Sequence, residues 1–125
     1  MEGKIHKILL VDDEPFILKM YQTKLERCGY AVITAENGKE ALRVAESEHP
    51  DIVLLDIVMN GMDGFAALKK MKKDDKLKRI PVFMLTNISS EKDKAEAFEL
   101  GAAGYYIKTH TDPSELANIV EHIGH

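Results

Sequence analysis

The chain has 125 residues, 45% of them hydrophobic and 30% charged, which suits one domain, residues 1–125, with a continuous core. Its 17 basic and 21 acidic residues give a formal net charge of −4, and the basic residues are dispersed, so direct nucleic-acid binding is not expected. No hydrophobic run approaches the ~18 residues of a membrane span and the N-terminus lacks a signal peptide, so we expect a cytoplasmic protein without membrane contact.

Five short hydrophobic runs rich in β-forming residues are each too short for a helix, and we predict that they are strands. In chain order they cover residues 8–11, 30–33, 52–55, 82–85 and 105–107. A segment with helical phase follows each run. The last segment is the clearest, because hydrophobic residues repeat there at helical spacing, at Leu116, Ile119, Val120 and Ile123.

Residues typical of helix ends bound the five helical segments. Candidate N-caps precede four of them, at Asn37, Asp63, Ser90 and Asp112. Gly29 and Gly101 stand where the C-terminus of a helix needs a left-handed residue. The single cysteine, Cys28, falls on the hydrophobic phase of the first helix, and we interpret it as a small buried core residue in a reducing compartment.

Strands that are hydrophobic throughout and separated by helices are typical of a parallel sheet covered on both faces. The expected fold class is therefore α/β, a doubly wound sandwich of five parallel strands and five helices. In such sheets the ligand site lies beyond the carboxyl ends of the strands. Functional residues are therefore to be sought at those strand ends.

Polar residues follow four of the predicted strands at their carboxyl ends. Asp12 and Asp13 follow the first strand, and Asp56 follows the third. Thr86 follows the fourth strand, and Lys108 follows the fifth. Three carboxylates, one hydroxyl and one ammonium would thus meet at a single edge of the sheet.

Each of these residues has a purely structural interpretation when taken alone. Asp13 could cap the first helix, and Asp56 and Thr86 could each belong to a turn. Lys108 could be a solvated surface lysine. Taken together, however, several carboxylates at one partly buried place repel one another unless a cation joins them. The set therefore predicts a divalent metal at this edge.

Phosphoryl transfer gives a role to all five residues. Magnesium takes carboxylate oxygens and bridges to phosphate, so Asp12, Asp13 and Asp56 can form its site. A carboxylate that attacks phosphorus gives an acyl phosphate, and Asp56 is placed to be that nucleophile. Lys108 would neutralise charge on the transferring oxygens, and the Thr86 hydroxyl would donate to one of them.

This set of motifs resembles the receiver domain of two-component response regulators, the single-domain chemotaxis type in particular, over essentially the whole chain. The motifs are Asp12-Asp13, Asp56 in LLDIVMNGMDG, Thr86 in PVFMLT and Lys108 in GAAGYYIKT. The resemblance implies a flavodoxin-like sheet of order 2-1-3-4-5. It implies that a histidine kinase or a histidine phosphotransfer protein phosphorylates Asp56 with Mg²⁺. Such a domain is not a conventional enzyme, because it catalyses only its own phosphorylation and dephosphorylation.

The resemblance also implies how the metal is held. Asp13 and Asp56 would bind Mg²⁺ directly, and Asp12 would reach it through a water molecule. The backbone carbonyl of Val58 would be a further ligand. The five histidines, in contrast, show no metal-binding spacing and are interpreted as solvent-exposed.

A conformational switch is the third implication of the resemblance. Thr86 would move toward the phosphoryl group, and Tyr105 would turn inward behind it. The face formed by the fourth helix, the fifth strand and the fifth helix, roughly residues 90–100, 105–108 and 112–122, would then bind a downstream output protein. A phosphorylation-linked homodimer is a further option.

Three features depart from the common receiver pattern. Thr109 stands where many receivers have a proline in a cis peptide, which leaves the direction of Lys108 open. Asn60 stands where proline is common in the loop after the acceptor. Val58 and Ile88 flank the expected path of the hydrolytic water, and their hydrophobic side chains predict a long-lived acyl phosphate.

Three other classes of function fit the sequence less well. An aspartyl-phosphate phosphatase would need a second acid at position 58, which is valine. A flavodoxin-like electron carrier would need a phosphate cradle after the first strand, where the acids would repel an anion. A degenerate receiver that only binds partners stays open through the missing proline. The sequence also leaves open whether the chain is a single-domain regulator, a phosphorelay intermediate or part of a longer regulator.

Overall fold

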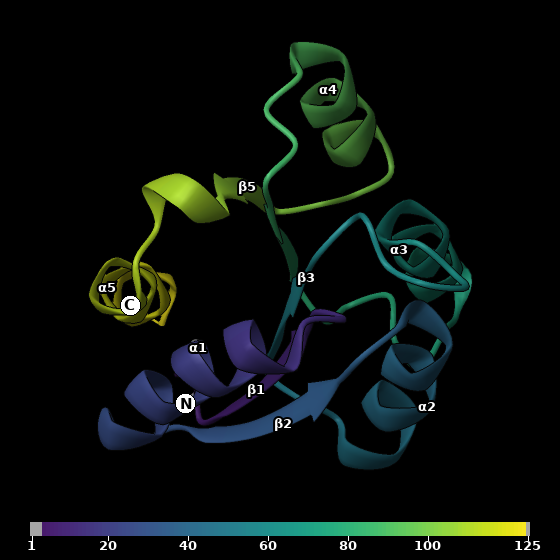
Figure 1. Ribbon diagram of the computed structural model, residues 1–125. Helices are drawn as coiled ribbons and strands as arrows, with labels where there is room; N and C mark the ends of the chain where they lie inside the picture. The colour runs from purple at the N-terminus through teal and green to yellow at the C-terminus, as the bar shows by residue number, and fades with distance from the viewer. Residues whose placement is uncertain (1–3, 125) are drawn as a thin grey trace.

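The computed structural model describes residues 4–124, which form a five-stranded sheet with helices on both faces (Figure 1). The strands are β1 (Lys7–Val11), β2 (Ala31–Ala35), β3 (Ile52–Leu55), β4 (Val82–Thr86) and β5 (Gly104–Ile107). The helices are α1 (Pro15–Arg27), α2 (Gly38–Glu48), α3 (Gly64–Lys73), α4 (Glu91–Glu99), the short 3₁₀ helix η1 (Lys108–His110) and α5 (Pro113–Ile123). All pairs of strands are parallel, and the order β2-β1-β3-β4-β5 confirms the predicted doubly wound α/β fold.

Successive residues of each strand point to opposite faces of the sheet, which divides the hydrophobic core into two layers. Helices α1 and α5 pack on one face, against Ile8, Leu10, Ile52, Leu54, Phe83 and Leu85. Helices α2, α3 and α4 contribute to the other layer, against Leu9, Val11, Val53, Leu55, Val82 and Met84. Figure 1 shows the two layers as α1 and α5 on the left and α2 and α3 on the right. Burial from both sides explains why β3 is hydrophobic at every position and why β1 and β4 are hydrophobic except at one end residue each, Lys7 and Thr86.

Side-chain caps begin four of the helices, as predicted. In each case the side chain accepts a hydrogen bond from the backbone N–H three residues later, at Asn37, Asp63, Ser90 and Asp112. Glu115 completes a capping box with Asp112. Helix α1 differs, because its N-cap residue Glu14 makes no side-chain hydrogen bond. Asp13 therefore does not cap α1, and its carboxylate lies toward the strand ends.

The end of α1 corrects one prediction. Gly29 follows α1 with a φ of 98°, and Gly101 follows α4 with a φ of 108°. Both predicted left-handed positions are therefore confirmed. Cys28, the C-cap of α1, is exposed. Its interpretation as a core residue is wrong, because the chain leaves the helical phase at this position.

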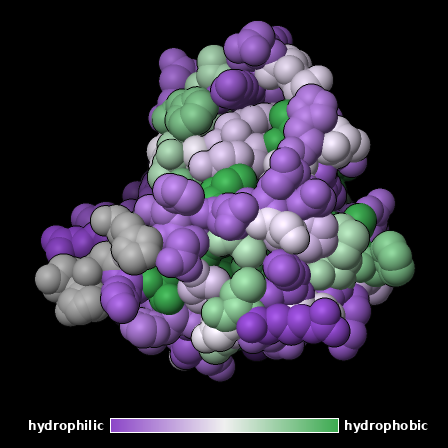
Figure 2. All heavy atoms as spheres, turned by 90° about the vertical axis from the view of Figure 1, so that its left-hand side faces the viewer, coloured by the Kyte–Doolittle hydropathy of each residue, from purple (hydrophilic) through white to green (hydrophobic). Residues whose placement is uncertain are grey.

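Most of the visible surface is hydrophilic. Figure 2 views the molecule from the side on which α5 lies in Figure 1, and it shows hydrophobic side chains only in small, separate patches. The most exposed large hydrophobic residues in the described part of the chain are Phe16, Val58 and Phe98. Every helix within residues 4–124 is too short or too polar to cross a lipid bilayer.

Candidate functional site

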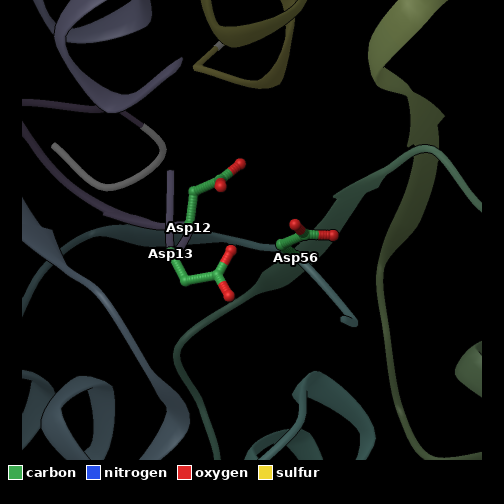
Figure 3. Close-up of side chains that lie close together, drawn as sticks. All are labelled: Asp12, Asp13 and Asp56. Carbon is green, nitrogen blue, oxygen red and sulfur yellow. The ribbon is translucent and has the colours of Figure 1, made fainter. Parts of the chain in front are cut away.

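The three predicted carboxylates meet at the carboxyl edge of the two central strands. Strands β1 and β3 are neighbours with Val11 opposite Leu55, so Asp12 and Asp56, the next residues, lie side by side. Each of Asp12, Asp13 and Asp56 offers a carboxylate oxygen within 4.8 Å of the others (Figure 3). Asp12 and Asp56 are only 3% and 4% exposed. The sheet therefore crowds negative charge at a place where water screens it poorly.

Backbone N–H groups hold each carboxylate in place. Asp56 Oδ1 accepts a hydrogen bond from its neighbour Ile57 at 2.7 Å, and Asp12 Oδ1 accepts one from Glu14 at 3.0 Å. Asp13 Oδ2 accepts a longer one, 3.2 Å, from Asn60 in the loop after β3. Backbone hydrogen bonds within and between the loops that follow β1 and β3 thus hold the acidic cluster together.

Lys108 supplies the cation that this cluster needs. Its Nζ lies 2.7 Å from Asp12 Oδ2 and 2.9 Å from Asp56 Oδ2, and its side chain is 9% exposed. Lys108 follows β5 at the edge of the sheet, so the side chain reaches past the end of β4 to join the two buried acids. The interpretation of Lys108 as a solvated surface lysine is therefore wrong.

Burial and ion pairing act on these groups in opposite directions. The pKa of Asp12 is raised, because burial outweighs the hydrogen bonds that it accepts from Lys108 and Glu14. Burial alone would lower the pKa of Lys108, but its hydrogen bonds to Asp12 and Asp56 and their charges outweigh burial and raise it. Lys108 is therefore a stable cation at neutral pH. One ammonium against three carboxylates leaves the site able to attract a further cation.

The donor set fits a hard divalent cation. Three converging carboxylates are oxygen ligands of the kind that Mg²⁺ prefers, and two of them, Asp13 and Asp56, border open space that can hold water ligands. That space is a cavity of about 300 Å³ lined by Asp13, Glu14, Asp56, Val58, Thr86, Asn87, Ile88 and Lys108. The role of the Val58 carbonyl as a metal ligand stays a prediction.

Thr86 and Tyr105 meet at the same residue of the loop after β4. Thr86, 1% exposed at the end of β4, accepts a hydrogen bond from the backbone N–H of Ile88 at 3.3 Å. The Tyr105 hydroxyl donates to the Ile88 carbonyl at 2.8 Å. The pKa of Tyr105 is raised, mainly by burial and then by the charges of Asp93 and Asp56. The two predicted switch residues are thus connected through Ile88.

The turn that carries Lys108 depends on residues that the sequence did not single out. No peptide bond among residues 4–124 is cis, and Lys108 opens the 3₁₀ helix η1. Thr111 closes this turn, and its carbonyl accepts a hydrogen bond from the buried hydroxyl of Tyr21. The one available signal was that a tyrosine on the buried face of α1 needs a partner for its hydroxyl.

The fold and the site together define a domain of the receiver class, and comparison with known proteins agrees. The sequence model of the family described as "Response regulator receiver domain" matches residues 8–121. The chain therefore belongs to the response regulator receiver family.

Curated relatives are longer than this chain. "Probable transcriptional regulator ycf27" of Guillardia theta is 41% identical over 110 residues, which is 88% of this chain and 42% of that protein. "Alkaline phosphatase synthesis transcriptional regulatory protein PhoP" of Bacillus subtilis (strain 168) is 44% identical over 102 residues, 82% of this chain and 42% of that protein. The chain thus spans less than half the length of these relatives.

Solved structures share the whole fold. The chemotaxis protein CheY4 of Vibrio cholerae superposes with a TM-score of 0.88 and 33% identity, covering 95% of this chain and 98% of that one. The BeF3-activated N-terminal receiver domain of Klebsiella pneumoniae RstA gives a TM-score of 0.84 and 29% identity, and the match covers 94% of this chain and 98% of that one.

Proposed function

We propose that the chain is an active receiver domain that accepts a phosphoryl group on Asp56 from a histidine kinase or a histidine phosphotransfer protein, with Mg²⁺ as cofactor. The single observation that carries this proposal is the ammonium of Lys108 held 2.9 Å from Asp56 and 2.7 Å from Asp12. A degenerate receiver has no use for a buried lysine aimed at the acceptor, so the ion pairs count against that alternative.

The chemistry is a displacement at phosphorus. A carboxylate oxygen of Asp56 attacks the phosphorus of the donor, the bond from phosphorus to the donor nitrogen breaks, and the nitrogen keeps the electron pair. Lys108 and the Thr86 hydroxyl face the developing charge on the phosphoryl oxygens. Mg²⁺, held by Asp12, Asp13, Asp56 and the Val58 carbonyl, would neutralise further charge on those oxygens. In this proposal the chain catalyses only its own phosphorylation and dephosphorylation. Its cytoplasmic location stays a prediction.

Intact-mass measurement after incubation with acetyl phosphate tests the proposal. The parent with Mg²⁺ should gain one phosphoryl group, and omission of Mg²⁺ should largely prevent this gain. Asp56→Asn should gain none, because the amide is not a nucleophile of this kind. The matched control is Asp51→Asn, since the Asp51 carboxylate binds the backbone of β1 at the opposite end of the strands. Equal labelling of the parent and Asp56→Asn would contradict the proposal.

The response to phosphorylation is proposed to pass through Ile88. A phosphoryl group adds roughly −1.5 to −2 charges and three acceptor oxygens. The Thr86 hydroxyl would turn to donate to one of these oxygens and would lose its hydrogen bond from the Ile88 N–H. Ile88 would then move, and with it the carbonyl that accepts the hydrogen bond of the Tyr105 hydroxyl. The affected face comprises α4, β5 and α5, with a cavity of about 430 Å³ between β5 and α5 that Tyr105 helps to line. This face is proposed to bind the output protein or a second phosphorylated copy.

Beryllofluoride, a mimic of the acyl phosphate, tests the switch. Its addition with Mg²⁺ should shift the amide NMR signals of α4 and β5 in the parent. In Thr86→Val it should still shift signals beside Asp56, but the shifts in α4 and β5 should fall to under about a third. Thr34→Val, on the outer strand β2, is the matched control. Unchanged α4 and β5 shifts in Thr86→Val would exclude Thr86 from the switch.

The acyl phosphate is expected to be long-lived. Val58 is 63% exposed and, like Ile88, it lines the cavity beside Asp56. Neither side chain can orient or activate a water molecule. The double variant Val58→Asn, Ile88→Glu should therefore lose its phosphoryl group about tenfold faster than the parent, measured by mass after removal of the donor. Phe98→Asn, at an exposed position on α4, is the control, and equal loss in the parent and the double variant would contradict this prediction.

A further inference from the structure

The side chain of Lys108 acts at a distance from its own backbone, so the turn that carries it sets its direction. Lys108 is the first residue after β5, while its Nζ contacts acids that follow β1 and β3 on the far side of β4. Residue 109 is threonine, so no proline ring restricts the backbone directly after Lys108. The hydrogen bonds around the turn therefore matter for its conformation.

Thr111 holds the turn with two hydrogen bonds. Its backbone N–H donates to the Lys108 carbonyl at 3.1 Å, and its side-chain hydroxyl donates to the Ile107 carbonyl at 2.8 Å. Thr111 is 4% exposed, so water competes little for either bond. The two bonds span the residue whose side chain enters the site.

Tyr21 ties this turn to the helix that begins at the acidic cluster. Its hydroxyl donates to the Thr111 carbonyl at 2.6 Å, across 90 residues of sequence, and Tyr21 is 2% exposed. Helix α1 starts directly after the acids, and Asp12 Oδ1 accepts a hydrogen bond from the backbone N–H of Glu14, the N-cap of α1. One helix therefore contacts both the carboxylate and the turn that presents its lysine.

We propose that Tyr21 and Thr111 are positioning residues for the phosphorylation reaction, which hold the turn after β5 so that the Lys108 ammonium meets Asp12 and Asp56. This inference rests on the proposed function of Asp56. Neither residue touches the reacting atoms, and both act through Lys108.

Two conservative variants break the arrangement at different points. Tyr21→Phe removes only the hydroxyl that binds the Thr111 carbonyl, and Thr111→Val removes only the hydroxyl that binds the Ile107 carbonyl. Each should be phosphorylated by acetyl phosphate and Mg²⁺ roughly tenfold more slowly than the parent. Tyr30→Phe is the matched control, because its hydroxyl contacts Glu121 at the other end of the strands, and its rate should equal that of the parent.

A double-mutant cycle separates positioning from a general loss of structure. If Tyr21 acts through Lys108, Tyr21→Phe should have no further effect on the rate once Lys108 is alanine. A merely structural role would slow the parent and Lys108→Ala by the same factor. That equal slowing would overturn the inference, as would a parent-like rate for both Tyr21→Phe and Thr111→Val.

A second readout does not depend on phosphorylation. In ¹⁵N-labelled protein without Mg²⁺, the ammonium signal of Lys108, assigned by its loss in Lys108→Ala, should be protected from exchange with water. Protection should fall in Tyr21→Phe and Thr111→Val but not in Tyr30→Phe. Unchanged protection would overturn the inference even if the parent is phosphorylated on Asp56. Failure of the parent to accept a phosphoryl group, with protection lost as expected, would instead overturn the proposed function and leave Lys108 held by these residues for another purpose.

Discussion

Replacing Lys108 with alanine is expected to slow phosphorylation of Asp56 by acetyl phosphate about 10²- to 10³-fold, even at saturating Mg²⁺. The Lys108 ammonium lies 2.9 Å from the buried Asp56, so its charge would already be in place when negative charge gathers on the phosphoryl oxygens. No other lysine or arginine contacts Asp56 in the described part of the chain. The rate is measured as the gain of mass with time.

The same substitution should also change stability in a way that Mg²⁺ reverses. Without Lys108, the buried carboxylates of Asp12 and Asp56 lose their cation, which costs about 3–5 kcal/mol of unfolding free energy. Added Mg²⁺ would supply the missing charge, so the loss should shrink when denaturant unfolding is repeated with the metal. Lys76→Ala is the control, because Lys76 pairs with Glu46 at 3.7 Å on the exposed surface. A Lys108→Ala protein that is phosphorylated at the parent rate would contradict the assigned role.

The second large effect is expected from Gly64→Ala at the start of α3. A Cβ at this position would lie 2.8 Å from Ile57 Cα and 2.9 Å from the Asp56 carbonyl carbon, and closer still to the Asp56 carbonyl oxygen. These are backbone atoms of Asp56 and its neighbour Ile57, so no flexible side chain can yield. The substitution should lower the free energy of unfolding by about 3 kcal/mol and move Asp56.

Two measurements check this prediction. Denaturant unfolding reports the loss of stability, and the phosphorylation rate of the folded fraction should fall at least about tenfold, since small displacements of a reacting group are costly. Gly124→Ala is the matched control, because an added Cβ there would approach its nearest neighbour, Ile5, only to 3.4 Å. Parent-like stability and rate in Gly64→Ala would show that the α3 start does not position Asp56.

The sequence predicted the sheet because its signals are local. Strands buried on both faces must be hydrophobic at every position, and helices must begin with groups that bind their first N–H donors. Those rules identify β3 to the residue and the caps at Asp63 and Asp112. The meeting of Asp12, Asp56 and Lys108 followed from the same signals, since the carboxyl ends of parallel strands share one edge.

The missed features depend on contacts between distant segments. The turn of Lys108 is held by Tyr21, which lies 90 residues away in sequence, and no local pattern encodes that bond. The error at Cys28 has a local cause. The helical period places Cys28 on the buried side, but α1 ends at Arg27, so Cys28 is exposed. Boundaries and long-range hydrogen bonds are where tertiary structure overrides local pattern.

The most direct test of the central claim is to locate the phosphoryl group. After incubation with acetyl phosphate and Mg²⁺, borohydride reduces an aspartyl phosphate to homoserine, and peptide mass spectrometry finds the altered residue. The account predicts homoserine at position 56 alone. Homoserine at position 12 or 13, or unaltered aspartate at all three positions, would contradict it.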